Sequence, residues 1–243
     1  WQATDLSKLI LAIEAIGYDP RDISSVNLLD AVGKRNGDNY LNTEYAIHAI
    51  KSGGYTSSTF TDTAMAEWAK NRAASLLNAT DGSFSNADNT MNWQPLVYWY
   101  GKEGFDDVTK AIKQALQKLP EIAQRATGSF CTAGFETGCM SYGNNAWNDA
   151  QALIFASIFD VNVLDRSSGF TKNGNNFLDA FFDLVDVDNG SIHGFTNYDV
   201  PQIARGLNAF VRQRKGQENF WDFSDVDVPT KTVNDLILAL DPN

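Results

Sequence analysis

Flat aromatic and short polar side chains gather at the starts of several apolar segments of this chain. Ten of them are candidate ligand-binding residues: Tyr40, Glu44, Asn92, Trp93, Trp147, Asn148, Asp149, His193, Tyr198 and Asp199. Aromatic rings can stack on apolar patches of a bound molecule, while amides and carboxylates provide directional hydrogen bonds. This combination predicts a site for a carbohydrate, a peptide or another small ligand. The alternative is structural, because Asn, Asp and Thr are also common helix N-caps.

Two kinds of polysaccharide cleavage could use the same residue types. A lyase would draw on four side chains: Asn148, His193, Tyr198 and Arg205. An inverting glycoside hydrolase needs two carboxyl groups about 6.5–9.5 Å apart, and Glu44 and Asp149 are the candidates. The sequence has no Gly-x-Ser-x-Gly elbow and no phosphate-binding glycine loop, so other nucleophilic chemistry is not indicated. No residue is therefore assigned as catalytic, and cleavage is the alternative to binding.

Cys131 and Cys139 are the only cysteines, and both lie in the Gly- and Ser-rich stretch SFCTAGFETGCMSYGNN. An even number of cysteines in one loop predicts a disulfide, with two reduced thiols as the alternative. No metal or other cofactor is expected, because the nearest calcium-loop pattern, at 186–190, lacks the downstream glutamate of an EF-hand. His48 lies within the helical pattern AIHAI, which predicts a packed position, whereas His193 lies in a turn that can serve a ligand.

The composition is that of an acidic globular protein. The chain has 243 residues, 43% of them hydrophobic, and its 30 acidic and 19 basic side chains give a net charge of −11. A nucleic-acid partner is not expected, because such proteins neutralise phosphates with clustered Lys and Arg. Membrane insertion is not expected either, since the longest apolar runs, such as 152–158, are far shorter than the ~20 residues of a span. A single domain over residues 1–243 can form its core without cross-links.

The elements that must position the candidate residues are helices. Apolar residues recur at helical spacing in five segments that are apolar around most of their circumference: 5–17, 43–55, 90–104, 148–161 and 198–216. Five amphipathic segments alternate with them: 25–35, 60–77, 106–124, 173–185 and 230–240. This alternation predicts helical hairpins, with the apolar helices inside and the amphipathic helices outside. Little strand is expected, because alternating β-branched runs are missing.

The predicted fold is all-α: an α/α toroid of about five hairpins, forming a complete or an incomplete ring. A stacked solenoid of the same hairpins is the alternative. If the inner helices run parallel, their N-termini meet at one end of the ring. The ten candidate residues then line that mouth, where the helix N-termini also favour electron-rich ligand groups.

Five stretches carry a family resemblance. They are TDLSKLILAIEAIGYDPRDISSVNLLDAV (4–32), AIHAIKSGGY (46–55), NDAQALIFA (148–156), FTKNGNNFLDAFFDLVDVDNGSIHGF (170–195) and RQRKGQENFWDFSDV (212–226). They resemble the α/α toroids of the terpenoid-cyclase and protein-prenyltransferase superfamily, in the form found on secreted and surface proteins of Gram-positive bacteria. Residues 60–145 match only in pattern, and NGDNYLNTEY (36–45) departs from the Gln-Gly and Asn-Gly-Pro residues usual there.

The resemblance implies an extracellular or cell-surface location and an earlier helix pair upstream of Thr4. We therefore expect the chain to belong to a longer precursor whose other domains are its partners. The residues that carry out the family's known reactions are missing from this sequence. There is no Asp-x-Asp-Asp acid, no Asp precedes Cys139 at the spacing of a zinc site, and Tyr142 stands where a thioester needs Gln. The expected function is a non-catalytic toroid module that binds a carbohydrate, a peptide or a small ligand, with a polysaccharide lyase or an inverting glycoside hydrolase as the alternative.

Overall fold

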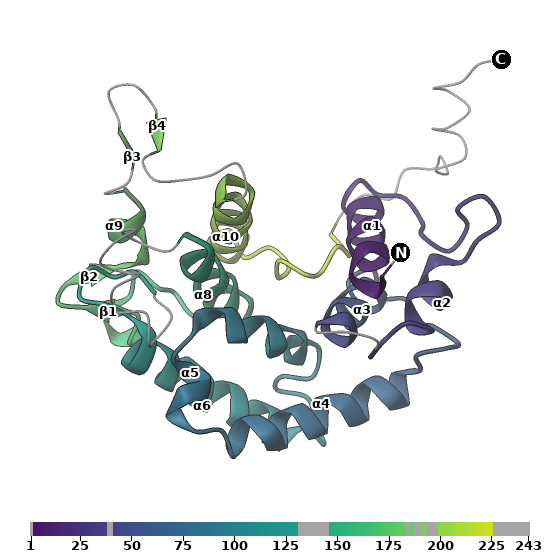
Figure 1. Cartoon of the computed structure of the whole chain (residues 1–243), viewed down its shortest axis with the longest axis horizontal. Helices are drawn as coiled ribbons and strands as arrows, with labels where there is room; N and C mark the ends of the chain where they lie inside the picture. Colours follow the sequence, from purple (N-terminus) through teal and green to yellow (C-terminus); the bar gives the residue numbers. More distant parts are fainter. Residues whose placement is uncertain are drawn as a thin grey trace. The chain divides into compact units, whose positions relative to one another are not determined.

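The computed structural model describes residues 2–37, 41–130, 146–182, 185–186, 191–192 and 199–225 (Figure 1). The chain divides into two compact units. Unit 1 comprises Trp1–Ala69 and Trp221–Asn243, and unit 2 comprises Lys70–Phe220. Each unit has its own buried core, so each is described by itself.

Unit 1 is built on two apolar helices, α1 (Ala3–Ala15) and α3 (Asn42–Lys51), with the short α2 (Leu28–Gly33) packed beside them. The ammonium of Lys8, in the middle of α1, lies 5.6 Å from the centre of the ring of Tyr45, in the first half of α3. At the C-terminal ends of both helices the Ser52 hydroxyl donates a hydrogen bond to the Glu14 carboxyl group. Because the two contacts follow the same order along both helices, α1 and α3 run parallel.

Local side chains set where these helices begin. The backbone N–H of Gln2 donates to the Asp5 carboxylate at 3.1 Å, which caps the start of α1. Asn27 accepts from the backbone N–H groups of Leu29 and Asp30 at the start of α2. Both helices therefore begin at a satisfied cap.

Unit 2 holds most of the remaining elements. Its α-helices are the end of α4 (Asp62–Leu77), α5 (Asp81–Phe84), α6 (Asp106–Ala123), α8 (Ala146–Ile158), α9 (Phe177–Phe182) and α10 (Asp199–Arg214). Its 3-10 helices are η1 (Ala87–Asn92), η2 (Gln94–Tyr98) and η3 (Arg166–Ser168). Two short antiparallel pairs complete it: β1 (Thr171–Lys172) with β2 (Asn175–Asn176), and β3 (Val185–Asp186) with β4 (Ser191–Ile192).

The apolar helix α8 is the centre of unit 2, and it lies beside α10 (Figure 1). A Cβ added to Gly206 would lie 3.1 Å from the Ala150 Cα, so the absence of a side chain there allows α10 to approach α8 closely. Farther along both helices, the side chain of Gln213 donates to Asp160 at 3.2 Å. The two contacts again follow the same order, so α8 and α10 run parallel.

The other side of α8 packs on η1 and η2. The Trp93 and Phe155 rings lie 5.8 Å apart, and the Tyr100 and Phe159 rings 5.2 Å apart. This order shows that η1 and η2 also run parallel to α8. The parallel direction expected for the inner helices is thus present within each unit.

The described residues are mostly helical, which confirms the predicted all-α class. The helix predicted at 90–104 is wrong in detail, because the chain forms η1 and η2 there. Pro95 has no N–H for a continuous α-helix and its ring would clash with the preceding turn. The segment 173–185 is also only partly helical, since β2 precedes α9. The predicted helix at 230–240 lies outside the described residues.

None of the described helices combines the length and the apolar character that crossing a membrane requires.

Candidate functional site

The structure describes seven of the ten predicted ligand-binding residues. Tyr40, His193 and Tyr198 lie outside the described residues, as do Cys131 and Cys139, and Asp199 is described only as the first residue of α10. Glu44 belongs to unit 1. Five candidates belong to unit 2: Asn92, Trp93, Trp147, Asn148 and Asp149.

Asp149 is enclosed in the packing of unit 2. Its Oδ1 atom accepts from the backbone N–H of Phe130 at 2.5 Å, and the Ser129 hydroxyl lies 3.1 and 3.0 Å from its two oxygens. Burial raises the pKa of Asp149 to about 8, and these hydrogen bonds act in the opposite direction. The carboxyl group therefore joins α8 to the segment that follows α6.

The neighbours of Asp149 are also engaged in packing. Asn148 is completely buried. The Trp147 indole N–H donates to Asp88, whose pKa burial raises to about 6. In unit 1, Glu44 is buried in the first turn of α3, where the helix dipole favours a carboxylate. Trp147, Asn148 and Glu44 thus lie in the first turns of their helices, where packing explains their positions.

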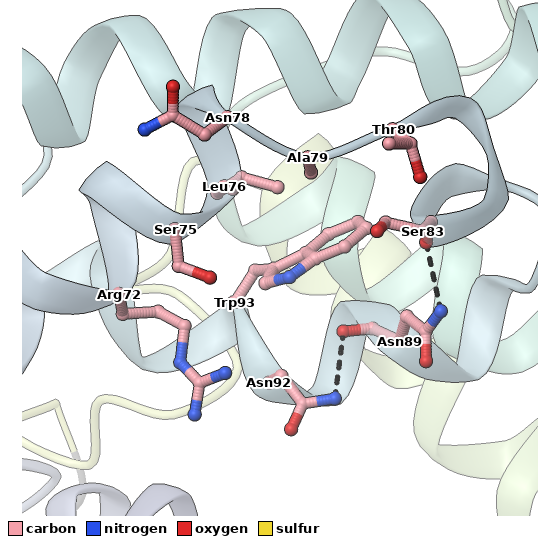
Figure 2. Close-up of a pocket in the computed structure, with 10 residues that line it drawn as sticks. All are labelled: Arg72, Ser75, Leu76, Asn78, Ala79, Thr80, Ser83, Asn89, Asn92 and Trp93. Atoms are coloured by element: carbon pink, nitrogen blue, oxygen red, sulfur yellow. Dashed lines mark hydrogen bonds between the residues drawn. The ribbon is translucent and has the colours of Figure 1, made fainter.

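Asn92 and Trp93 line a cleft of about 470 Å³ in unit 2 (Figure 2). This volume falls within the range of about 300–1,000 Å³ that ligand pockets occupy. The lining residues come from the end of α4, the link to α5, α5 itself and η1. They are Arg72, Ser75, Leu76, Asn78, Ala79, Thr80, Ser83, Asn89, Asn92 and Trp93.

Helix geometry explains one wall of the cleft. Arg72, Ser75 and Leu76 follow the i, i+3, i+4 spacing that places side chains on one face at the end of α4. Leu76 is buried, whereas Ser75 is exposed and Arg72 is half-buried. This face therefore presents an apolar base with polar groups above it.

The opposite wall depends on the 3-10 geometry of η1. Residues three apart eclipse one another in a 3-10 helix, so Asn89 and Asn92 lie on the same side of η1. The Asn89 amide donates to the Ser83 carbonyl at 2.8 Å, and the Asn92 amide donates to the Asn89 carbonyl at 3.3 Å (Figure 2). Both amides are thus held in place by the backbone.

Trp93 forms the floor of the cleft. Its ring lies 5.5 Å from Phe84 and 5.8 Å from Phe155, and only 5% of the residue is exposed. Figure 2 shows the indole in the middle of the cleft, between the Ser75 and Ser83 side chains. The aromatic contact available to a ligand is therefore small, and most of the lining consists of amide and hydroxyl groups.

The charge of the cleft differs from that of the chain. Although the chain has a net charge of −11, Arg72 is the one charged side chain among the ten described lining residues, and none of these ten is acidic. Within the described part of the chain, no group of three or more His, Cys, Asp and Glu side chains could hold a metal ion. The cleft is thus arranged for hydrogen bonding around a single positive charge.

A second buried carboxyl group lies in unit 1. Ser52 donates to Glu14, and the backbone N–H of Phe223 donates to the Ser52 carbonyl at 2.9 Å. Nearby, Trp221 stacks on His48 with ring centres 4.0 Å apart, which confirms the packed position predicted for His48. Burial raises the pKa of Glu14 to about 8, and its Oε1 atom has no hydrogen-bond partner among the described residues.

The sequence analysis found two of the cleft residues and missed the others, Arg72 and Asn89 among them. Two signals were present. The spacing of Arg72 and Ser75 places two polar side chains on one face of a helix, and the three-residue period of Asn86, Asn89 and Asn92 matches a 3-10 helix. The predicted helix at 90–104 hides the second signal, because it starts after Asn89 and so separates Asn86 and Asn89 from Asn92.

Comparisons with protein-family models, with curated proteins and with solved structures found no significant match.

Proposed function

We propose that this chain is a non-catalytic module of an extracellular or cell-surface protein and that it binds a carbohydrate. The ligand occupies the cleft lined by α4, η1 and the link between α4 and α5. The observation that carries this proposal is the lining: seven of ten residues are polar, and their amides and hydroxyls surround a tryptophan floor.

The chemistry of the lining favours a sugar over an apolar ligand. A sugar ring offers many hydroxyl groups and a small apolar face, which match the hydroxyls and amides around the limited surface of Trp93. Asn89 and Asn92 are held by hydrogen bonds to backbone carbonyls. Holding the amides in advance lowers the entropy that binding must remove.

Two observations favour binding over cleavage. Glycoside hydrolysis uses a pair of carboxyl groups, and the ten described residues that line the cleft include none. Asp149, a candidate acid of the same unit, uses both oxygens to bind Ser129 and Phe130. A buried carboxyl in that arrangement contributes to folding.

The fold we propose for the whole chain is an α/α toroid similar to those of the terpenoid-cyclase and prenyltransferase superfamily. The parallel direction of α1 with α3, and of η1, α8 and α10, supports it. A toroid of alternating hairpins requires its inner helices to run in one direction, whereas an up-and-down bundle alternates the direction of neighbouring helices.

A glycan array probed with the intact chain tests the function, with binding and released product both measured. We expect binding without product. Asn92→Ala removes one amide of the cleft and should weaken binding about threefold to tenfold, the range for one hydrogen bond. The control is Asn208→Ala on the exposed surface of α10; it should bind as the unaltered chain does. Binding of no glycan, or equal binding by both variants, would contradict the proposal, and released product would contradict its non-catalytic part.

A further inference from the structure

Trp93 carries a hydrogen-bond donor for which the described residues supply no acceptor. The residue is 5% exposed, and its indole N–H donates to none of the described residues, although the ring packs on Phe84 and Phe155. A buried indole N–H normally has a partner, because leaving it unpaired costs free energy. Figure 2 shows the indole nitrogen on the floor of the cleft, turned toward the end that holds Arg72 and Asn92. The floor therefore offers a donor to a bound molecule.

Asn89 offers the complementary group at the other end of the cleft. Its side-chain amide nitrogen donates to the Ser83 carbonyl at 2.8 Å, which fixes the orientation of the amide. The Asn89 Oδ1 atom accepts no hydrogen bond from the part of the chain that the structure describes. In Figure 2, Asn89 lies next to Ser83, on the far side of the indole from Arg72. A donor and an acceptor are thus held in place along one floor.

The apolar surface of the cleft is small. It consists of Leu76, Ala79 and Trp93, and both Leu76 and Trp93 are almost completely buried. Figure 2 shows Leu76 and Ala79 along one edge of the indole, with Asn89 and Asn92 along the other. This apolar area does not match the face of a whole sugar ring. It matches a single methyl group.

We infer, on the basis of the proposed carbohydrate-binding function, that the ligand is an N-acetylated sugar whose acetamido group binds between Trp93 and Asn89. In a trans amide the C=O and N–H bonds point in opposite directions. The acetamido oxygen therefore accepts from the Trp93 indole N–H, and the acetamido N–H donates to Asn89 Oδ1. The methyl group lies against Leu76 and Ala79, so each part of the acetamido group has a partner.

A hydroxyl group at the same carbon of the sugar cannot replace the acetamido group. It has no methyl group, and its single oxygen is too short to meet a donor and an acceptor on opposite sides of the floor. A site built to bond one polar group discriminates against an analogue that lacks it, because its own buried groups are then left unpaired. The hydroxyls of Ser75, Thr80 and Ser83 contact the rest of the ring in both sugars, so they do not affect this choice.

The test uses a glycan array of matched pairs. Glycans of N-acetylglucosamine, N-acetylgalactosamine and N-acetylmannosamine are each printed beside the counterpart that has a hydroxyl in place of the acetamido group. We expect the intact chain to bind the acetylated member of at least one pair at least about tenfold more tightly, the effect of about two hydrogen bonds. Trp93→Phe and Asn89→Ala should each lose most of this preference. Trp99→Phe is the matched control and should keep it, because Trp99 is a buried tryptophan of the same unit outside the cleft lining.

The indole N–H also provides a signal that a packing role would not move. In the ¹⁵N-labelled chain, the Trp93 indole resonance is the one that Trp93→Phe removes. We expect it to shift when the acetylated glycan of the preferred pair is added and to stay in place with the hydroxyl counterpart. The Trp99 indole resonance should not move with either glycan.

The outcomes separate this inference from the function on which it rests. Equal binding within every pair, a preference that survives in both cleft variants, or an unmoved Trp93 resonance overturns the acetamido ligand and leaves carbohydrate binding in place. Binding of no glycan overturns both proposals, and so does binding of acetylated peptides alone on the same array. The comparison within a pair uses the unaltered chain, so it stands even where a variant fails to fold.

Discussion

Glu14 in unit 1 and Asp149 in unit 2 are two buried carboxyl groups whose pKa burial raises to about 8. A serine hydroxyl donates to each of them, from Ser52 and from Ser129. Their remaining partners differ. Asp149 also accepts from the backbone N–H of Phe130, whereas the Oε1 atom of Glu14 has no hydrogen-bond partner among the described residues.

The two carboxyl groups therefore differ in what they do for their neighbours: Asp149 accepts a hydrogen bond from a buried backbone N–H group and, among the described residues, Glu14 does not. Asp149 supplies the acceptor that a buried backbone N–H requires, so its loss would leave a second group unsatisfied. Glu14 supplies an acceptor only to a side chain that could be removed with it. A raised pKa alone therefore does not show what a buried acid contributes to folding.

Asp149→Ala should produce the largest loss of stability. It leaves the Phe130 N–H and the Ser129 hydroxyl without an acceptor and opens a small cavity. We expect the free energy of unfolding to fall by about 3 kcal/mol. Urea unfolding followed by tryptophan fluorescence measures the change, and hydrogen exchange of the Phe130 amide locates it.

Asp107→Ala is the matched control, because Asp107 is exposed and pairs with Lys110 at the surface. A change of no more than about 0.5 kcal/mol is expected there. Equal losses in the two variants would contradict the distinction between a buried acceptor and a surface charge.

Glu14→Gln should have the opposite sign at pH 8. Between about pH 4.5 and 8, Glu14 holds a proton in the folded chain and loses it in the unfolded chain, because its pKa is raised from 4.5 to about 8. Its contribution to stability is therefore full below pH 4.5 and declines as the pH rises to 8. Glutamine does not ionise, so the variant should avoid this loss, which is about 4 kcal/mol at pH 8 for a shift of this size, and should show a flatter pH profile.

Unfolding free energies of both chains at pH 3.5 and at pH 8 check this expectation. At pH 3.5 the two should differ little, because Glu14 is then close to protonated in both states. Parallel pH profiles, with no flattening in the variant, would contradict a raised pKa of Glu14 in the folded chain.

The sequence predicted the strongly periodic helices because their apolar residues repeat without interruption, as in α1 and α8. It mispredicted the segment 90–104, where Asn and Thr side chains bond to nearby backbone groups and Pro95 interrupts the ladder. This local departure creates the 3-10 face that lines the cleft. Asn92 could thus be named from the sequence, but the wall it shares with Asn89 could not.

Asp149 shows a second limit of prediction from the sequence. An acidic residue at a helix start suits a ligand site, a cap and a buried acceptor equally well. Its partners, Ser129 and Phe130, lie about 20 positions earlier in the chain. Only the fold reveals that they meet.

The smallest effects should come from the two serines, which sharpen the comparison. Ser52 and Ser129 are both buried, and each donates to its carboxyl group. Ser52→Ala leaves Glu14 with no hydrogen-bond donor that the structure describes, so we expect a loss of about 1 kcal/mol; Ser129→Ala leaves Asp149 its bond from Phe130, so about 0.5 kcal/mol is expected.

The pH dependence distinguishes these losses from a simple packing defect. The Ser52 hydroxyl lowers the pKa of Glu14 against the effect of burial, so its removal should raise that pKa further. The decline of stability with pH should then continue above pH 8 in Ser52→Ala. In Ser129→Ala the Phe130 N–H still favours the ionised form of Asp149, and the extension should be smaller. If the decline of stability ended at the same pH in both variants, the Phe130 N–H would not account for the difference between Glu14 and Asp149.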